Sequence, residues 1–268
     1  MRRRLVCALG LSLAAAVWSA AAQKPAAAEK SREKTFRVLV MPDARPEFFA
    51  AEPNPVHPGF EREILEGFVR PRHLKLEVIR VKDWDDLMAA LQGGRGDIIA
   101  GHFTDTEERR KSIDFTAGVM PTQTVLVTRK PGPRVTTQED LVKRRIGAVK
   151  GGASLKAVVA AGAPKANIDD SPTQDEILAL LQSGRVSALA RALPLAILNT
   201  REDPELELGM FVGPRSHFAW GVRKDDAKLR DALNAHLAMV RRTGAWQRFV
   251  VKYFGESAVD MIKQAESR

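Results

Sequence analysis

The feature that most constrains this fold is an alternation of strand-like and helix-like segments that begins at residue 36. Residues 36–40 (FRVLV) form a mainly apolar run, and residues 74–79 (LKLEVI) alternate between apolar and polar as strand residues do. The proline-rich stretch 45–59 predicts a loop. Apolar side chains recur at helical spacing in 60–69 and in 84–91, where Asp83 is the candidate helix cap, and a short apolar run follows at 97–101. The order strand, helix, strand, helix, strand predicts an α/β domain with a mostly parallel sheet.

The second half of the chain repeats this alternation. We predict strands at 125–127, 145–149, 186–190 and 218–222, helices starting near 139, 154 and 177, and two apolar helical stripes at 229–240 and 246–253. A chain of 268 residues is long enough to form two such lobes, each with its own buried core.

The first 35 residues have a different character. The chain has three arginines near its start, followed by an apolar run over 5–17 that is too short to cross a bilayer and by small residues at 20–22. This pattern predicts a signal peptide over 1–22, cleaved before Gln23. An uncleaved N-terminal anchor is the alternative. Residues 23–35 are small and charged, which predicts a linker. The net charge of +9 fits nucleic-acid or membrane-surface binding, but the secretion signal and the dispersed charge disfavour nucleic acid.

Residues that carry catalytic or metal chemistry are sparse. The single cysteine, Cys7, lies within the predicted signal peptide and supports neither a disulfide framework nor a cysteine metal site. The five histidines are scattered without ligand spacing, and no HExxH or GxSxG motif occurs. We therefore expect no metal, no cofactor and no catalytic residue.

The most informative stretch is Thr104-x-Thr106-x-x-Arg109, which follows a predicted buried strand. Free N–H groups at a helix start, hydroxyl groups and a guanidinium form a receptor for a carboxylate, and the planar guanidinium matches two carboxylate oxygens. The plainer interpretation is that Arg109, within the charge run 107–111, lies on a solvated helix face.

Several segments in a fixed order resemble the bacterial solute-binding proteins of family 3, the periplasmic receptors of polar amino-acid ABC transporters. The resemblance covers 36–255 and rests on 59–64 (GFEREI), 84–97, 104–116, 176–186 and 252–255 (KYFG). It implies the type II periplasmic-binding fold, with two α/β lobes joined by two hinge strands. Lobe one would comprise 36–123 plus 219–268, and lobe two would comprise 124–218.

The resemblance also implies a function. The protein would be a periplasmic monomer that captures a small carboxylate-bearing solute, an amino acid or related organic acid, between its lobes and passes it to an inner-membrane ABC permease. Two alternatives are a dehydratase of the cyclohexadienyl type, for which Glu61 and Glu63 are candidate acids, and a sensor or regulatory module of the kind found beside lytic transglycosylase domains. We expect a free binding protein.

Site residues are carried over by position from the family motifs. Arg109 matches the arginine that grips the ligand carboxylate, Thr104 the hydroxyl beside it, and Trp84 an aromatic that flanks the ligand. His102 stands where the family usually has a small residue that offers its backbone. The lobe-two turn is expected to reach the same carboxylate through Lys150, Gly152 and Ala153. Plainer interpretations make Trp84 a core residue, His102 a hydrogen-bonded loop residue and Lys150 a surface residue.

One position departs from the family pattern. An aspartate that accepts hydrogen bonds from the ligand ammonium is replaced by Ala192, just before Pro194. The cation end of the site is therefore missing, which favours a carboxylate or dicarboxylate without an ammonium group. Asp43 or Glu61 are alternative acceptors, and Arg45 and Arg191 are expected to add positive charge near the mouth.

Overall fold

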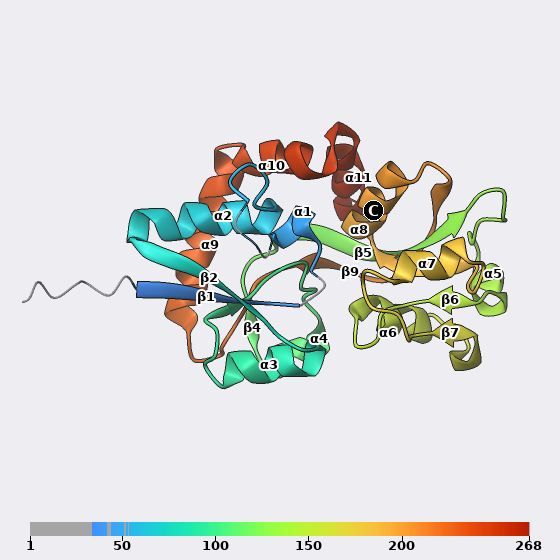
Figure 1. Cartoon of the computed structure of the whole chain (residues 1–268), viewed down its shortest axis with the longest axis horizontal. Helices are drawn as coiled ribbons and strands as arrows, with labels where there is room; N and C mark the ends of the chain where they lie inside the picture. Colours follow the sequence, from blue (N-terminus) through green and yellow to red (C-terminus); the bar gives the residue numbers. More distant parts are fainter. Residues whose placement is uncertain (1–33, 42–43, 51, 53, 268) are drawn as a thin grey trace, which may run out of the picture. The chain divides into compact units, whose positions relative to one another are not determined.

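The computed structural model describes residues 34–41, 44–50, 52 and 54–267, and these contain two five-stranded mixed sheets (Figure 1). This confirms the predicted fold class. The first sheet has the order β2 (Leu74–Arg80), β1 (Lys34–Val40), β3 (Ile98–Ile99), β10 (Gly221–Val222) and β4 (Asp114–Phe115). The second has the order β7 (Ile168–Asp169), β6 (Ile146–Gly147), β8 (Ala188–Ala192), β5 (Met120–Arg129) and β9 (Leu206–Phe218).

The N-terminal predictions fall mostly outside this range. The signal peptide over 1–22 and residues 23–33 of the linker predicted over 23–35 lie outside the described residues. The last two residues of that predicted linker belong to a strand instead. Strand β1 begins at Lys34, two residues earlier than predicted, and it pairs in parallel with β2 and β3. The division into lobes at 123/124 and 218/219 remains a prediction.

Helices cover both faces of the first sheet because side chains on β1 alternate. Val38 and Val40 pack in one cluster with α2 (Phe60–Val69) and α9 (Ala227–Arg242), whereas Leu39 packs with α3 (Trp84–Gln92). In Figure 1, α2 and α3 lie on opposite sides of β1 and β2. Asp83 caps α3 as predicted, accepting a hydrogen bond from the Asp86 backbone N–H at 2.8 Å. The short helices of this part are η1 (Arg70–Arg72) and α4 (Glu107–Arg110).

The second sheet is built in the same way. Helices α6 (Ala153–Ala160), α7 (Ile177–Gln182) and α8 (Leu193–Glu202) pack against its strands. The remaining helices of this part are α5 (Gln138–Lys143), which begins with a capping box on Thr137, and η2 (Lys165–Asn167).

Strand β5 is longer than the sequence indicates, and β9 (Leu206–Phe218) lies almost entirely outside the predicted strands. They pair antiparallel from Met120↔Phe218 to Arg129↔Leu206, whereas we predicted strands only over 125–127 and 218–222. Strand β9 contains Gly209, where a Cβ atom would lie 2.3 Å from the Val135 carbonyl oxygen, so glycine permits a close backbone contact rather than a turn. At its end Phe218 forms an isolated antiparallel bridge with Thr104, which follows β3 of the first sheet.

Two further elements escaped prediction. The proline-rich stretch expected to be a loop contains α1 (Pro46–Phe49), which begins with a proline and buries Phe48 and Phe49 completely. Near the C-terminus, α10 (Ala245–Phe254) is followed by α11 (Glu256–Ser267), and α11 contacts both β5 and α8.

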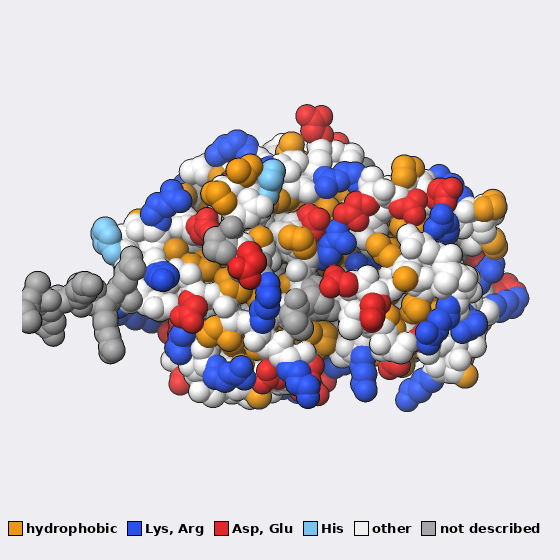
Figure 2. All heavy atoms as spheres, in the orientation of Figure 1, with side chains coloured by type: hydrophobic (Ala, Val, Ile, Leu, Met, Phe, Trp, Pro, Cys, Tyr) orange, Lys and Arg blue, Asp and Glu red, His pale blue; other side chains and the backbone are white. Residues whose placement is uncertain are grey.

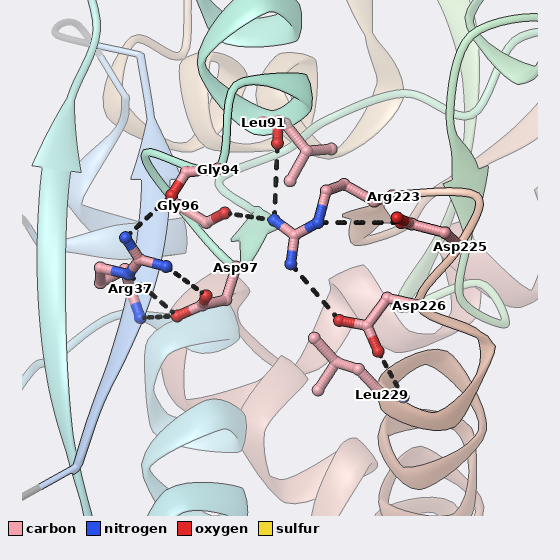
Figure 3. Close-up of polar contacts among 9 residues, drawn as sticks. All are labelled: Arg37, Leu91, Gly94, Gly96, Asp97, Arg223, Asp225, Asp226 and Leu229. Atoms are coloured by element: carbon pink, nitrogen blue, oxygen red, sulfur yellow. Dashed lines mark hydrogen bonds and ion pairs between the residues drawn. The ribbon is translucent and has the colours of Figure 1, made fainter.

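Two arginines hold the turn between α3 and β3, as Figure 3 shows. Arg37 pairs with Asp97 at 2.8 Å and donates to the Gly94 carbonyl, while Arg223 donates to the Gly96 carbonyl at 2.8 Å and pairs with Asp226. The family-like segment 84–97 therefore has a structural role at its C-terminal end, because Asp97 fixes the start of β3.

The surface mixes charges of both signs. On the face drawn in Figure 2, lysine and arginine side chains are interspersed with aspartate and glutamate side chains. Among the helices in the described part of the chain, none is both long enough and apolar enough to cross a bilayer.

Candidate functional site

A cavity of about 50 Å³ collects most of the residues that the sequence singled out. Its lining comes from loops, helix ends and strand ends that adjoin the two sheets: Trp84, His102, Thr104, Arg109, Val149, Gly152, Ala153, Ser154, Gln174, Ala190, Arg191, Ala192, Leu195 and Phe218. Of the eight predicted site residues, Lys150 alone does not line it. Lys150 is exposed and borders a neighbouring open crevice together with Trp84, Val149 and Thr173.

Arg109 is the central cation of the cavity. It is half-buried, its Nη1 donates to the Thr104 carbonyl at 2.7 Å, and its guanidinium lies 4.8 Å from the Trp84 ring and 4.2 Å from the Phe103 ring. Loss of surrounding water lowers the pKa of Arg109 to about 10, so the group stays charged at neutral pH. It forms no ion pair with any carboxylate in the described part of the chain.

The threonines of the motif have separate roles. Thr106 is the N-cap of α4, and its hydroxyl accepts a hydrogen bond from the Arg109 backbone N–H at 3.3 Å. Thr104 lines the cavity and is tied to Phe218 by its backbone bridge. The cap thus fixes the backbone of Arg109 while Thr104 holds its guanidinium.

His102 lies in a tight turn directly after β3. It has φ +55° and follows Gly101 at φ +88°. The buried Glu61 carboxylate stabilises this turn by accepting hydrogen bonds from the Gly101 N–H at 2.9 Å, the His102 N–H at 2.6 Å and the Trp220 indole at 3.0 Å. The structure therefore gives Glu61 a positioning role, and Glu61 does not line the cavity.

Trp84 begins α3 on the same side of the cavity. Its ring stacks on Phe103 with centroids 6.0 Å apart, and it contacts Gly151, where an added Cβ would come within 2.9 Å of the Trp84 ring. Gly151 has φ +74°, so glycine suits this position in both backbone conformation and space.

The opposite wall is the N-terminus of α6. Gly152 is its N-cap, and Gly152, Ala153 and Ser154 line the cavity. The first N–H groups of a helix have no partner within the helix, and the helix dipole places partial positive charge there. The Ser154 hydroxyl is held by the Thr124 hydroxyl at 3.2 Å.

Arg191 is a second cation of the cavity, and the sequence placed it only near the mouth. It is 2% exposed, its Nε donates to Asn199 Oδ1 at 3.1 Å, and its Nη1 donates to Gln174 Oε1 at 3.0 Å. Arg45, the other arginine expected there, pairs instead with Glu47 at 3.0 Å and with Glu202 at 2.6 Å. The sequence signal for a buried Arg191 was a basic residue within an apolar strand. Charged side chains are almost never fully buried unless they have polar partners.

No acidic side chain is among the described residues of the lining. Ala192 lines the cavity at the N-cap of α8, where the family pattern has an aspartate. Glu63, the other candidate acid, binds Lys252 at 2.8 Å and also accepts from the Tyr253 hydroxyl. Asp43 lies outside the described residues. Within the described ranges no group of three or more His, Cys, Asp or Glu side chains is arranged to hold a metal ion.

The model of one protein family, the bacterial extracellular solute-binding proteins of family 3, matches residues 36–256. The chain belongs to this family. The match spans both sheets and every described residue of the cavity lining.

Two relatives show the kinds of protein that the chain resembles. The amino-acid-binding protein YxeM of Bacillus subtilis, named as probable, is 28% identical over 213 residues, covering 78% of this chain and 80% of YxeM. Membrane-bound lytic murein transglycosylase F of Desulfosudis oleivorans is 26% identical over 207 residues, covering 75% of this chain. The chain spans only 45% of that transglycosylase.

Solved structures agree on the fold. A mutant of ArgBP from T. maritima matches with a TM-score of 0.72 at 23% identity, covering 85% of this chain and 97% of the other. At that identity the likeness shows the type II periplasmic-binding fold alone, which the two mixed sheets described above also have.

The burial of His102 predicts a dependence of stability on pH. Burial, together with the charges of Arg191, Arg45 and Arg109, lowers the pKa of His102 to about 3, whereas an unfolded histidine titrates near 6.5. Below pH 6.5 the unfolded chain gains a proton that the folded chain does not, so stability falls as the pH falls. Between pH 6 and pH 4, wild type should lose up to about 1.4 kcal/mol per pH unit relative to His102→Asn.

Urea unfolding at several pH values measures this difference. Asparagine tolerates a positive φ, so His102→Asn keeps the turn. His57→Asn, at an exposed position, is the control and should follow the wild-type profile. If the free energy of unfolding depended on pH in the same way for wild type and His102→Asn, His102 would gain its proton equally in the folded and unfolded states. That result would contradict the prediction.

Proposed function

We propose that this chain is a periplasmic receptor that captures a small carboxylate-bearing solute, an amino acid or related organic acid, between two lobes for uptake through an inner-membrane ABC permease. We expect it to be secreted through its signal peptide, to act as a monomer and to have no catalytic role. Membership in the solute-binding family supports the general function. The observation that carries the proposal is the Arg109 guanidinium, which lines the cavity together with the α6 N-terminus and has no described carboxylate partner.

This arrangement suits a carboxylate for electrostatic reasons. A guanidinium and several helix N–H groups can share one carboxylate, and each charge-assisted hydrogen bond is stronger in a partly dehydrated cavity than in water. Binding is favoured over dehydratase chemistry because Glu61 and Glu63, the two candidate acids, are engaged away from the cavity. A positioned acid in the cleft is what that reaction would require.

A regulatory module is the second candidate, and the likeness to lytic murein transglycosylase F favours it. Uptake of a labelled ligand by cells with and without the gene separates the two candidates. Lost uptake supports the transport function, and unchanged uptake supports the regulatory module.

Arg109→Ala should abolish ligand binding and leave the fold intact. Loss of a charge-assisted pair in a cleft costs about 2–5 kcal/mol, which corresponds to a loss of affinity of roughly 30-fold to several thousand-fold. Because the Arg109 charge is partly dehydrated in the folded state, the ligand-free variant should be no less stable than wild type. The probes are carboxylates that raise the melting temperature of wild type in a screen, followed by calorimetry.

Arg110→Ala is the matched control. Arg110 adjoins Arg109 but is exposed and pairs with Asp105 outside the cavity, so its loss should change affinity little. Equal affinities of Arg109→Ala and wild type would overturn the carboxylate site.

Ligand binding should close the two lobes. Elements of the two sheets meet around the cavity, where Lys156 of α6 pairs with Glu108 of α4 and Gly151 contacts Trp84. A ligand held by both sides should favour this closed arrangement, so small-angle scattering should give a smaller radius of gyration with saturating ligand. Arg109→Ala mixed with the same ligand should keep the larger radius, and identical wild-type curves would contradict a closing mechanism.

Acids without an α-amino group should bind better than the corresponding amino acids. Ala192 offers no side-chain acceptor, and an ammonium group without a partner is costly to dehydrate beside Arg109 and Arg191. Calorimetry of paired ligands, propionate with L-alanine and succinate with L-aspartate, should show a preference of about tenfold or more for the deaminated acid.

Ala192→Asp should shift this preference toward the amino acids because it restores an anionic acceptor. Ala192→Asn, of similar size and without charge, is the control and should not. Tighter binding of amino acids by wild type would show that another group accepts the ammonium hydrogens.

A further inference from the structure

Two ring nitrogens on one wall of the cavity have no hydrogen-bond partner within the described part of the chain. They are Nε2 of His102 and Nε1 of Trp84, and both atoms are buried. Both residues line the cavity, and His102 is only 6% exposed. Buried polar atoms are nearly always paired, so two unpaired nitrogens on residues that line one cavity indicate a ligand with matching polar atoms.

Neither ring can turn away to find another partner. The His102 backbone is fixed by Glu61, and its ring packs against Phe48 at 5.3 Å and Phe218 at 6.0 Å between centroids. The Trp84 ring stacks on Phe103 and is blocked by Gly151 on the other lobe. This wall is therefore pre-organised, and its two nitrogens keep their places when the ligand enters.

The chemistry of the two nitrogens narrows the ligand class. An indole N–H only donates, so Trp84 requires an acceptor such as an oxygen atom. The imidazole of His102 is neutral, because burial and the neighbouring guanidinium groups lower its pKa to about 3, and one ring nitrogen then donates while the other accepts. A hydroxyl group satisfies either tautomer and also accepts from indole. An ammonium group cannot accept from Trp84 and is repelled by Arg109 and Arg191.

We infer that the ligand is a small hydroxy or oxo acid, whose uncharged oxygen substituent is recognised by His102 Nε2 and Trp84 Nε1 while its carboxylate binds Arg109. The inference rests on the proposed function, since it names the ligand class of the same cavity. It assigns specificity to His102 and Trp84, which adjoin the first sheet, and affinity to the guanidinium of Arg109.

The test measures the advantage of an oxygen substituent by calorimetry. The probes are two series with fixed carbon skeletons: L-lactate, pyruvate, propionate and L-alanine, and L-malate, succinate and L-aspartate. In at least one series wild type should bind the hydroxy or oxo acid about tenfold more tightly than the unsubstituted acid, the effect of one or two hydrogen bonds. Comparing lactate with pyruvate distinguishes a hydroxyl from a keto ligand.

Two variants locate the source of this advantage. Trp84→Phe keeps the aromatic ring and removes the N–H, and His102→Asn keeps the turn and removes the imidazole. Each should reduce, several-fold, the ratio of the affinity for the hydroxy acid to the affinity for the unsubstituted acid. Trp246→Phe is the matched control. The Trp246 indole N–H donates to the Val119 carbonyl oxygen at 2.7 Å, and Trp246 does not line the cavity, so this variant should keep the wild-type affinity ratio.

The outcomes separate this inference from the proposed function. Equal binding of substituted and unsubstituted acids, or tighter binding of the amino acids, overturns the inference and leaves an Arg109-dependent carboxylate receptor in place. Wild-type ratios in both Trp84→Phe and His102→Asn overturn it as well. If no acid of either series binds in an Arg109-dependent manner, both the proposed function and this inference fail.

Discussion

The site depends on one constraint: the Arg109 guanidinium has lost surrounding water and has no carboxylate partner among the described residues. Arg109 is held by the Thr104 carbonyl and by the faces of Trp84 and Phe103, which orient the charge but do not neutralise it. Within the described residues the cavity adds a second guanidinium, Arg191, and no acid. Among the described residues the charge of Arg109 therefore has no acidic partner, which is why we propose an anionic ligand for this cavity.

The two sheets supply the parts of this site through the ends of their strands. The turn after β3 presents His102, the segment after β6 leads into the N-terminus of α6, and β8 ends at Ala192 as α8 begins. Open α/β sheets bind ligands at the carboxyl ends of their strands, because loops and helix N-termini converge there. The long pair β5 and β9 brings the second sheet to the first, where Phe218 bridges to Thr104.

Local signals made part of this architecture predictable. The cap at Asp83, the apolar stripe of α3 and the Thr-x-Thr-x-x-Arg spacing depend on neighbours within a few residues, and the structure has the first two as expected and places Thr104 and Arg109 at one cavity. Elements that depend on distant partners were missed. Strand β9 is held by pairing with β5 despite its glycines, and α1 by burial of its two phenylalanines. Arg191 was expected near the mouth, but its burial depends on contacts with Gln174 and Asn199. Partners that are distant in the sequence cannot be inferred from the spacing of neighbouring residues.

In the binding mode that we propose, affinity and specificity are carried by different groups of the cavity. A guanidinium attracts every small carboxylate, so Arg109 cannot by itself distinguish one acid from another. Discrimination requires groups that are satisfied by one ligand and left unpaired by its competitors, and buried polar atoms that remain unpaired are heavily penalised. On the side of the second sheet, Ala192 provides this discrimination because it has no side-chain acceptor, so the ammonium group of an amino acid would remain unpaired there. His102 and Trp84 provide it on the first-sheet side by offering fixed nitrogens to an oxygen, with Glu61 and the surrounding aromatic rings keeping the imidazole in place.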